Sequence, residues 1–191
     1  MYKKILVYSL FVVAVFSSCI KSKDVVYTQN LAELDAASFN APFGTLTYPF
    51  LTRQPLPGRA IIASGDAFIT RASGTATFRV NLLGKQRGTA SIVKYNVVAV
   101  GAAVGATVTY GAPVSGTLTT FDGVSGTHYT DPGGGVCTIP ANTSFGTITI
   151  GIINSGVSAN TTALLSIELV DGGDVAPSTN YRKIALAIAQ K

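Results

Sequence analysis

Hydrophobic and polar residues alternate in several stretches of the chain, most clearly between residues 126 and 170. Every second position of residues 148–152 is isoleucine, and in residues 165–169 leucine or isoleucine alternates with serine and glutamate. A period of two residues is typical of a strand with one buried face. Both segments are therefore predicted to be β-strands, and the turn-forming residues 154–160 predict a reversal between them.

The same alternation predicts further strands at residues 59–63, 67–71, 77–83, 91–99, 104–110, 116–121 and 181–189, with another ending at Ile139. Segments rich in glycine and proline separate them, as expected of hairpin loops. In residues 181–189, isoleucine and leucine share one face and alanines share the other, which is small enough to lie under a neighbouring loop. About seven to nine strands predict an all-β fold, an immunoglobulin-like antiparallel β-sandwich, with a closed barrel as the alternative.

The N-terminal part of the chain has a weaker pattern. Leu31 and Leu34 are spaced as on a helix, so a short helix is expected within residues 25–40. Four prolines follow, and because proline removes a backbone donor, a strand near residues 44–50 should lie at a sheet edge. The aromatic residues of this region are expected to cover one end of the sandwich or to form an exposed platform; they are Phe39, Phe43, Tyr48 and Phe50.

The composition fits a single sandwich. Of the 191 residues, 47% are hydrophobic and 12% charged, which is enough for one hydrophobic core. The predicted division is a signal peptide at residues 1–18, an anchor, spacer and proline-rich lead-in at 19–58, and the sandwich at 59–191. The net charge is +5, and the basic residues are dispersed, which favours a solvated surface over nucleic-acid binding.

The first twenty residues have the order of a secretory leader. Two lysines precede the apolar residues 5–16, and this stretch is shorter than a membrane-spanning helix. Ser17 and Ser18 then precede Cys19, an order that resembles a bacterial lipobox, although Phe16 stands where leucine is usual. A lipidated Cys19 is therefore predicted, with an ordinary cleaved signal as the alternative. Ile20 differs from the aspartate that retains lipoproteins at the inner membrane, so we expect a lipid anchor in the outer membrane, with the protein facing the surface or the periplasm.

Residues 126–170 also carry a family resemblance. The sequence Gly-Thr-His-Tyr-Thr at 126–130, the Ile-Pro-Ala at 139–141 and the two strands that follow resemble the Calx-beta pattern, and related immunoglobulin-like modules occur in surface lipoproteins of Bacteroidota type. The resemblance covers the C-terminal half to two-thirds of the chain. It implies a Calx-beta-like sandwich in which carboxylates near strand ends hold calcium, and the comparable residues here are Asp122, Asp131, Asp171 and Asp174.

Calcium needs six to eight oxygen ligands, and this chain offers few. Asp171 and Asp174 form the one close pair, to which Asp131 could add a third carboxylate. We therefore expect weak calcium binding at most, with turn formation by aspartate as the alternative role of these residues. No other cofactor is expected.

The sequence assigns no catalytic residue. His128 is the only histidine, and it lies in a predicted turn where Tyr129 is expected to pack at the edge of the core. Cys137 shares a strand face with Ile139, which favours a buried hydrophobic role over a reactive thiol. The chain has no Walker loop, dinucleotide fingerprint or zinc-ligand spacing, so the protein is predicted not to be an enzyme.

These features predict a non-catalytic lipoprotein of the outer membrane or cell surface, whose immunoglobulin-like module binds or adheres to glycan or protein ligands. The alternatives are a structural accessory subunit of an envelope complex and a weak calcium-binding module. Exposed aromatic residues on the loops would favour glycan binding, whereas a long unpaired edge strand would favour assembly by strand addition.

Overall fold

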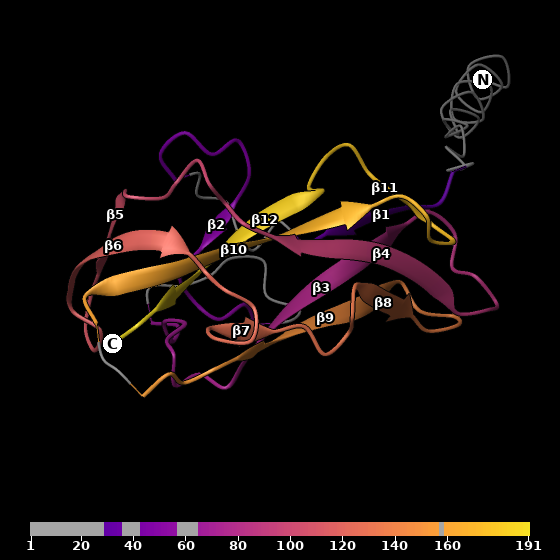
Figure 1. The fold of residues 1–191 in the computed structure, drawn as a ribbon. Coiled ribbons are helices and arrows are strands. Elements are labelled where there is room, and N and C mark those ends of the chain that lie inside the picture. The colour runs from indigo at the N-terminus through magenta and orange to yellow at the C-terminus, as the bar shows by residue number, and fades with distance from the viewer. Residues whose placement is uncertain (1–28, 36–42, 57–64, 157–158) are drawn as a thin grey trace, which may run out of the picture.

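The computed structural model describes residues 29–35, 43–56, 65–156 and 159–191, which form two β-sheets and no helix. The all-β sandwich predicted from the alternation is confirmed (Figure 1). Nine of the twelve strands in these residues have four residues or more. The same residues contain no helix long and apolar enough to cross a membrane. The predicted leader and Cys19 lie outside the described residues.

The first sheet contains five strands in the order β11-β1-β3-β9-β7. Their bounds are β1 Leu31–Leu34, β3 Thr75–Leu83, β7 Tyr129–Thr130, β9 Phe145–Ile152 and β11 Ala176–Pro177. The second sheet contains seven strands, with the path β2-β12-β10-β4-β8. Their bounds are β2 Phe50–Leu51, β4 Ser91–Val98, β5 Thr107–Tyr110, β6 Gly116–Asp122, β8 Val136–Ile139, β10 Thr161–Val170 and β12 Lys183–Ala189.

Strand β10 organises the second sheet. It pairs with β12 along one side, from Thr162 to Glu168. Its other side is divided, because β6 pairs with residues 161–164 and β4 with residues 166–170. Strand β5 extends the sheet beyond β6, and β8 extends it beyond β4. The second sheet is therefore forked around a single central strand.

Most strand pairs are antiparallel, as predicted, but three pairs among the described residues are parallel. These are β1 with β11, β6 with β10, and β2 with β12. In each of them the two strands are distant in sequence, so no tight hairpin fixes their relative direction. The expectation of uniformly antiparallel pairing was wrong for these three.

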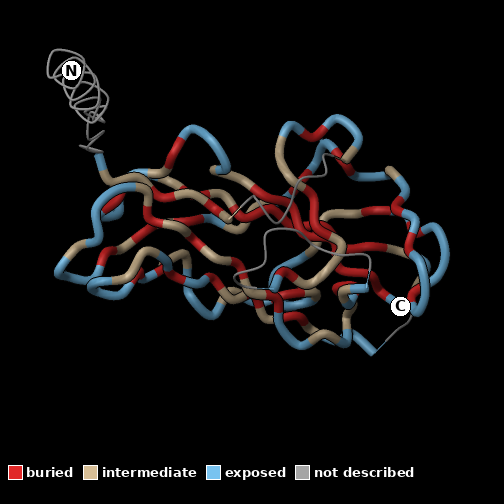
Figure 2. The backbone as a smooth tube through the Cα atoms, turned by 180° about the vertical axis from the view of Figure 1, so that it is seen from behind, coloured by how far each residue is buried: buried red, intermediate tan, exposed pale blue. Residues whose placement is uncertain are grey.

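Hydrophobic side chains are buried on both sides of the second sheet. The main core lies between the sheets and includes Phe78, Tyr95, Ile150, Leu165 and Ile184. A second cluster, which we call the outer cluster, packs on the other face of β10 and β12; it includes Leu46, Phe50, Phe68, Tyr110, Leu118, Leu164 and the alanines Ala185, Ala187 and Ala189. The alanine face of β12 thus lies under neighbouring segments, as predicted. Figure 2 shows the buried backbone running through the middle of the molecule.

The N-terminal expectations were met in part. The helix expected within residues 25–40 was wrong, because residues 31–34 form strand β1, with Ala32 and Leu34 buried against the main core. Strand β2 lies at a sheet edge, as the prolines predicted. The rings of Phe43 and Phe50 stack with centroids 4.3 Å apart and cover the sheet rather than forming an exposed platform. Phe39 lies outside the described residues.

Other strand boundaries also differ from the prediction, and β5 begins at Thr107 rather than at residue 104. Residues 67–71 make only isolated bridges, from Phe68 to Arg53 and from Thr70 to Ala189. The last strand begins at Lys183 rather than Tyr181. The strand predicted at residues 59–63 falls outside the described residues. The domain division at residue 59 stays a prediction, although β1 and β2, which precede it, are strands of the two sheets.

Candidate functional site

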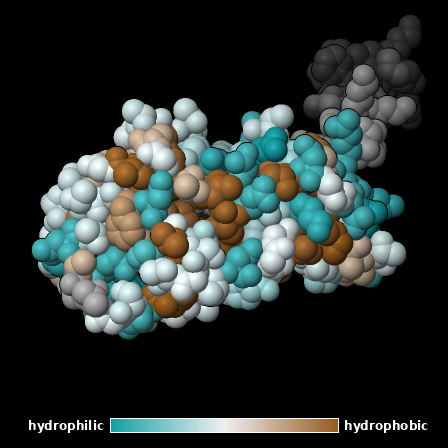
Figure 3. Space-filling model, viewed as in Figure 1, coloured by the Kyte–Doolittle hydropathy of each residue, from teal (hydrophilic) through white to brown (hydrophobic). Residues whose placement is uncertain are grey.

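A groove of about 760 Å³ opens at the edge of the second sheet, where the chain leads into β2 and β12. Its lining is formed by Thr47, Tyr48, Pro49, Thr179, Asn180, Tyr181, Arg182 and Lys183. Figure 3 shows the surface indented at the top of the view, between the segment before β2 and the loop before β12. The volume is in the range of small-ligand sites, which is about 300–1,000 Å³.

The parallel pairing of β2 and β12 brings the two walls together. Because the strands run in the same direction, the segments that precede them lie at the same end. The register places Phe50 beside Ala185, and the Ala185 amide donates to the carbonyl of Pro49 at 2.8 Å. Residues 47–49 and 179–183 therefore face each other although they are far apart in sequence.

Strand β1 holds the loop that forms the second wall. The Ser178 amide donates to the Ala32 carbonyl at 2.7 Å, and the Leu34 amide donates to the Tyr181 carbonyl at 2.9 Å. Within the loop, the Asn180 amide donates to the Ser178 hydroxyl at 3.2 Å. The loop backbone is thus fixed at three points.

Tyr181 is the most unusual residue of the groove. Its φ is +40°, in the left-handed region, where a bulky side chain is sterically disfavoured. Its side chain is also 48% exposed, although it is a large aromatic residue. A strained conformation persists only where the surroundings hold it, and such residues concentrate at functional sites. Tyr181 therefore marks the groove as the candidate site.

Tyr48 lies on the first wall and is only partly buried. It packs against the outer cluster, and the Lys183 ammonium lies 4.9 Å from its ring centroid. A cation within about 6 Å of an aromatic ring is attracted by the ring face. The groove thus presents aromatic rings from both walls, together with hydroxyl, amide and cationic groups.

The carboxylate of Asp131 holds the loop between β7 and β8. It accepts hydrogen bonds from the Gly135 amide at 2.8 Å, from the Gly133 amide at 3.2 Å and from the Tyr95 hydroxyl. Burial and the hydrogen bond to Asp131 both raise the pKa of Tyr95, so its hydroxyl stays a donor. Asp131 acts here as a turn-forming residue.

Two of the other aspartates suggested by the Calx-beta resemblance also accept hydrogen bonds from the backbone. The Asp174 carboxylate accepts from the Ile92 amide at 2.8 Å, and Asp122 accepts from the amides of Val100 and Gly101 at 2.9 and 3.0 Å. Asp171 is exposed on the turn after β10. In the described ranges, no three residues of the types Asp, Glu, His and Cys lie close enough together to hold a metal.

The carboxylates of Asp131 and Asp174 thus already accept hydrogen bonds from backbone amides, as turn-forming or loop-fixing groups do. Weak calcium binding at Asp171 and Asp174 stays a prediction.

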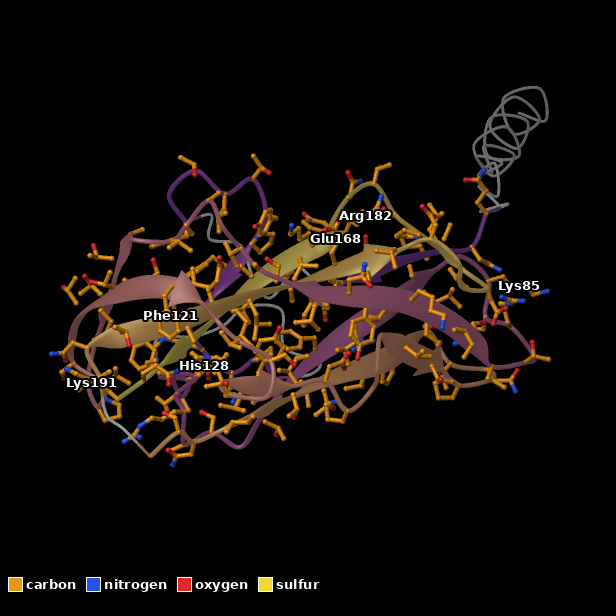
Figure 4. The ribbon with its side chains drawn as sticks, in the orientation of Figure 1. Lys85, Phe121, His128, Glu168, Arg182 and Lys191 are labelled. Carbon is orange, nitrogen blue, oxygen red and sulfur yellow. The ribbon has the colours of Figure 1, made fainter. Side chains whose placement is uncertain are left out.

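The side chains considered for a catalytic role make contacts within the fold. The Nδ1 atom of His128 accepts from the Val124 amide at 3.0 Å, and its ring packs edge-on against Phe121 (Figure 4). Cys137 and Tyr129 both lie in the main core, as predicted, with exposed fractions of 1% and 7%. Burial raises the pKa of the Cys137 thiol to about 11.

The groove was not predicted from the sequence. Its walls come from segments that meet through the parallel pair β2 and β12, and parallel pairing of distant strands leaves no local pattern. The local sequence feature that could have indicated the groove is the polar turn Ser178–Thr179–Asn180, which directly precedes the aromatic residue Tyr181.

Comparison with known proteins gives similarity to solved structures alone. No family model matches the chain, and no curated protein matches it. The apo-form Calx CBD1 domain aligns at 12% identity and a TM-score of 0.47, covering 84% of this chain and 96% of that one. The CBD12 structure from CALX1.2 aligns at 14% identity and a TM-score of 0.43, covering 63% of this chain and 40% of that one.

A third solved structure is a protein of Bacteroides ovatus ATCC 8483 provisionally described as carbohydrate-binding. It aligns at 11% identity and a TM-score of 0.38, covering 62% of this chain and 32% of the other. The three similarities concern the fold alone. The function has to be argued from the groove.

Proposed function

We propose that this protein is a non-catalytic, lipid-anchored envelope protein whose β-sandwich binds a saccharide in the groove between the leads into β2 and β12. The observation that carries the proposal is Tyr181, an aromatic residue held at φ +40° and 48% exposed at the groove. An exposed aromatic ring beside a groove offers a flat apolar face on which a ligand can stack.

The groove has the chemistry that a saccharide needs. One face of a sugar ring carries C–H groups, which pack on aromatic rings, and its edge carries hydroxyl groups, which exchange hydrogen bonds with polar side chains. Tyr48 and Tyr181 supply the rings, and Thr47, Thr179 and Asn180 supply hydroxyl and amide groups. The shape is an open groove, which suits a chain of sugars better than a single small molecule.

The rigidity of the site supports the same function. Hydrogen bonds to β1 fix the backbone of the loop around Tyr181, so little conformational freedom is left to lose on binding. A fixed ring is preorganised for stacking. The predicted Cys19 anchor would hold this groove at the envelope, where glycans are available.

The test is saccharide binding by the full chain, purified in a non-ionic detergent and applied to an array of bacterial, plant and animal glycans. We expect binding to at least one group of related glycans. Tyr181→Gly should weaken it about tenfold or more, equivalent to about 1.4 kcal/mol. Glycine adopts a positive φ readily, so this variant removes the ring without disturbing the loop backbone.

Phe145→Ala is the matched control. Phe145 is 44% exposed, close to the exposure of Tyr181, but it lies on β9 of the other sheet. Its removal should leave glycan binding unchanged. A chain that binds no glycan would favour the accessory-subunit alternative instead. A chain that binds glycan equally well without the Tyr181 ring would show that the binding site is not this groove.

A further inference from the structure

The lining of the groove is positively charged on one side. Arg182 and Lys183 both line it, and no acidic residue of the described chain does. The carboxylate next to them is Glu168 on β10, which pairs directly with Lys183 across the strands and is not part of the lining. Figure 4 shows Arg182 and Glu168 close together near the start of β12.

One carboxylate is shared between two cations. The Lys183 Nζ lies 3.4 Å from Glu168 Oε2, and the Arg182 Nε lies 3.7 Å from Glu168 Oε1. The three side chains together carry one net positive charge. Each is partly exposed, at 28% for Lys183, 41% for Arg182 and 33% for Glu168, so solvent screens their pairing and a ligand can reach them.

The guanidinium of Arg182 is oriented for a further partner. Its Nε–H donates to the Leu169 carbonyl at 2.8 Å, which fixes the plane of the group. Among the residues that the structure describes, its two terminal amino groups make no hydrogen bond. A planar guanidinium with free terminal amino groups matches the two oxygens of a carboxylate.

Lys183 places a second charge beside the aromatic wall. Its ammonium lies near both the Tyr48 ring and the Glu168 carboxylate. A sugar bound in the groove beside Tyr48 would thus have a cation close to it. We infer that the groove selects saccharides that carry carboxylate groups, which Arg182 and Lys183 recognise.

This inference rests on the proposed function, and the experiment separates the two. Oligosaccharides of galacturonate, glucuronate, mannuronate and sialate are each compared with their own methyl ester, which keeps the sugar and removes the charge. Binding to the full chain in detergent is measured by calorimetry at low and high salt. We expect at least one acid to bind about tenfold more tightly than its ester at low salt, and the difference to shrink at high salt.

Three charge variants test which side chains at the groove produce the preference for the acid over its ester. Arg182→Gln and Lys183→Gln should each reduce the ratio of the affinity for the acid to the affinity for its ester severalfold. Glu168→Gln removes the competing carboxylate, so it should strengthen binding of the acid severalfold, a gain that misfolding cannot produce. Lys85→Gln is the matched control, since Lys85 is an exposed lysine away from the groove (Figure 4).

The outcomes are distinct. Equal affinity for acid and ester would overturn the selectivity and leave saccharide binding standing. Binding to no saccharide of either kind would overturn both. Loss of the preference in Lys85→Gln as well would show a general effect of charge rather than recognition by the groove.

Discussion

Cys137 lies where β8 passes over β9. A Cβ atom added at Gly146 of β9 would lie 2.6 Å from the carbonyl oxygen of Thr138 and 2.8 Å from the sulfur of Cys137. The two strands are therefore in close contact. The thiol is buried in the main core, and burial raises its pKa to about 11. Because the thiolate is the reactive form, folding lowers the reactivity of this cysteine at every pH below that value.

We expect Cys137 to resist thiol reagents in the folded protein. In a Cys19→Ser chain it is the only cysteine left, since the sequence has two. Labelling by an aromatic disulfide reagent at about pH 8 should be negligible in buffer and stoichiometric in concentrated guanidinium. The slow reaction of the folded chain should become faster as the pH rises toward 11, because the thiolate fraction increases. Labelling of the native chain as fast as the unfolded one would contradict the burial.

Residue positions were predictable where they follow from alternation. The buried place of Cys137 follows from the strand face that it shares with Ile139, and that of Tyr129 from an aromatic residue in a turn directly before a strand. The strained conformation of Tyr181 does not, because hydrogen bonds from β1 hold it, and β1 is about 150 residues away in sequence. The resemblance suggests calcium at the aspartates, for which the sequence predicts weak binding at most or a turn-forming role. In the structure Asp131 accepts from the amide of a nearby turn residue and Asp174 from the Ile92 amide of β4.

Strand β12 packs tightly on both of its faces. Its alanine face lies against the outer cluster, and Ala187 is fully buried there. Ala187→Leu adds three carbon atoms where no space is available, so it should lower the free energy of unfolding by about 1–3 kcal/mol. Guanidinium unfolding of the full chain in detergent, followed by circular dichroism, measures the change.

Ile188→Leu is the control for that substitution. Ile188 is the neighbouring residue on the opposite face of β12, in the main core, and the exchange conserves volume. It should cost less than about 1.5 kcal/mol. Equal effects of the two changes would show that the alanine face is not tightly packed.

The strands with a clear period of two were predicted within about two residues of their bounds, as in β3, β4 and β6. β1 was missed because four residues are too few to establish a period, and its strand conformation depends on pairing with β3 and β11. The parallel pairs were missed because direction between distant strands is decided by how the layers assemble.

For the whole molecule, the sequence predicts an attachment to the membrane at Cys19. We expect labelled palmitate to enter the wild-type chain in a bacterial host and to be absent from Cys19→Ser. The reason is that a thioether-linked lipid requires the cysteine sulfur next to the cleavage position. Membrane fractionation followed by autoradiography checks both chains.

Cys137→Ser is the matched control, because it removes the other cysteine and should leave palmitate incorporation unchanged. Equal labelling of Cys19→Ser and the wild type, or none of the wild type, would contradict the anchor. An unlabelled but secreted wild-type chain would support the ordinary signal peptide instead.

The hydrogen bond from Leu34 to Tyr181 would have a mechanical consequence in a chain tethered through the predicted lipid anchor at Cys19. β1 is the strand closest to the tether along the chain, and it also touches the loop that carries Tyr181. Tension between a glycan bound in the groove and a lipid anchor at Cys19 would therefore load the hydrogen bonds that join β1 to the loop of Tyr181. Under flow, β1 would separate from β3 and β11, and the ligand would be released before the core of the sandwich opened.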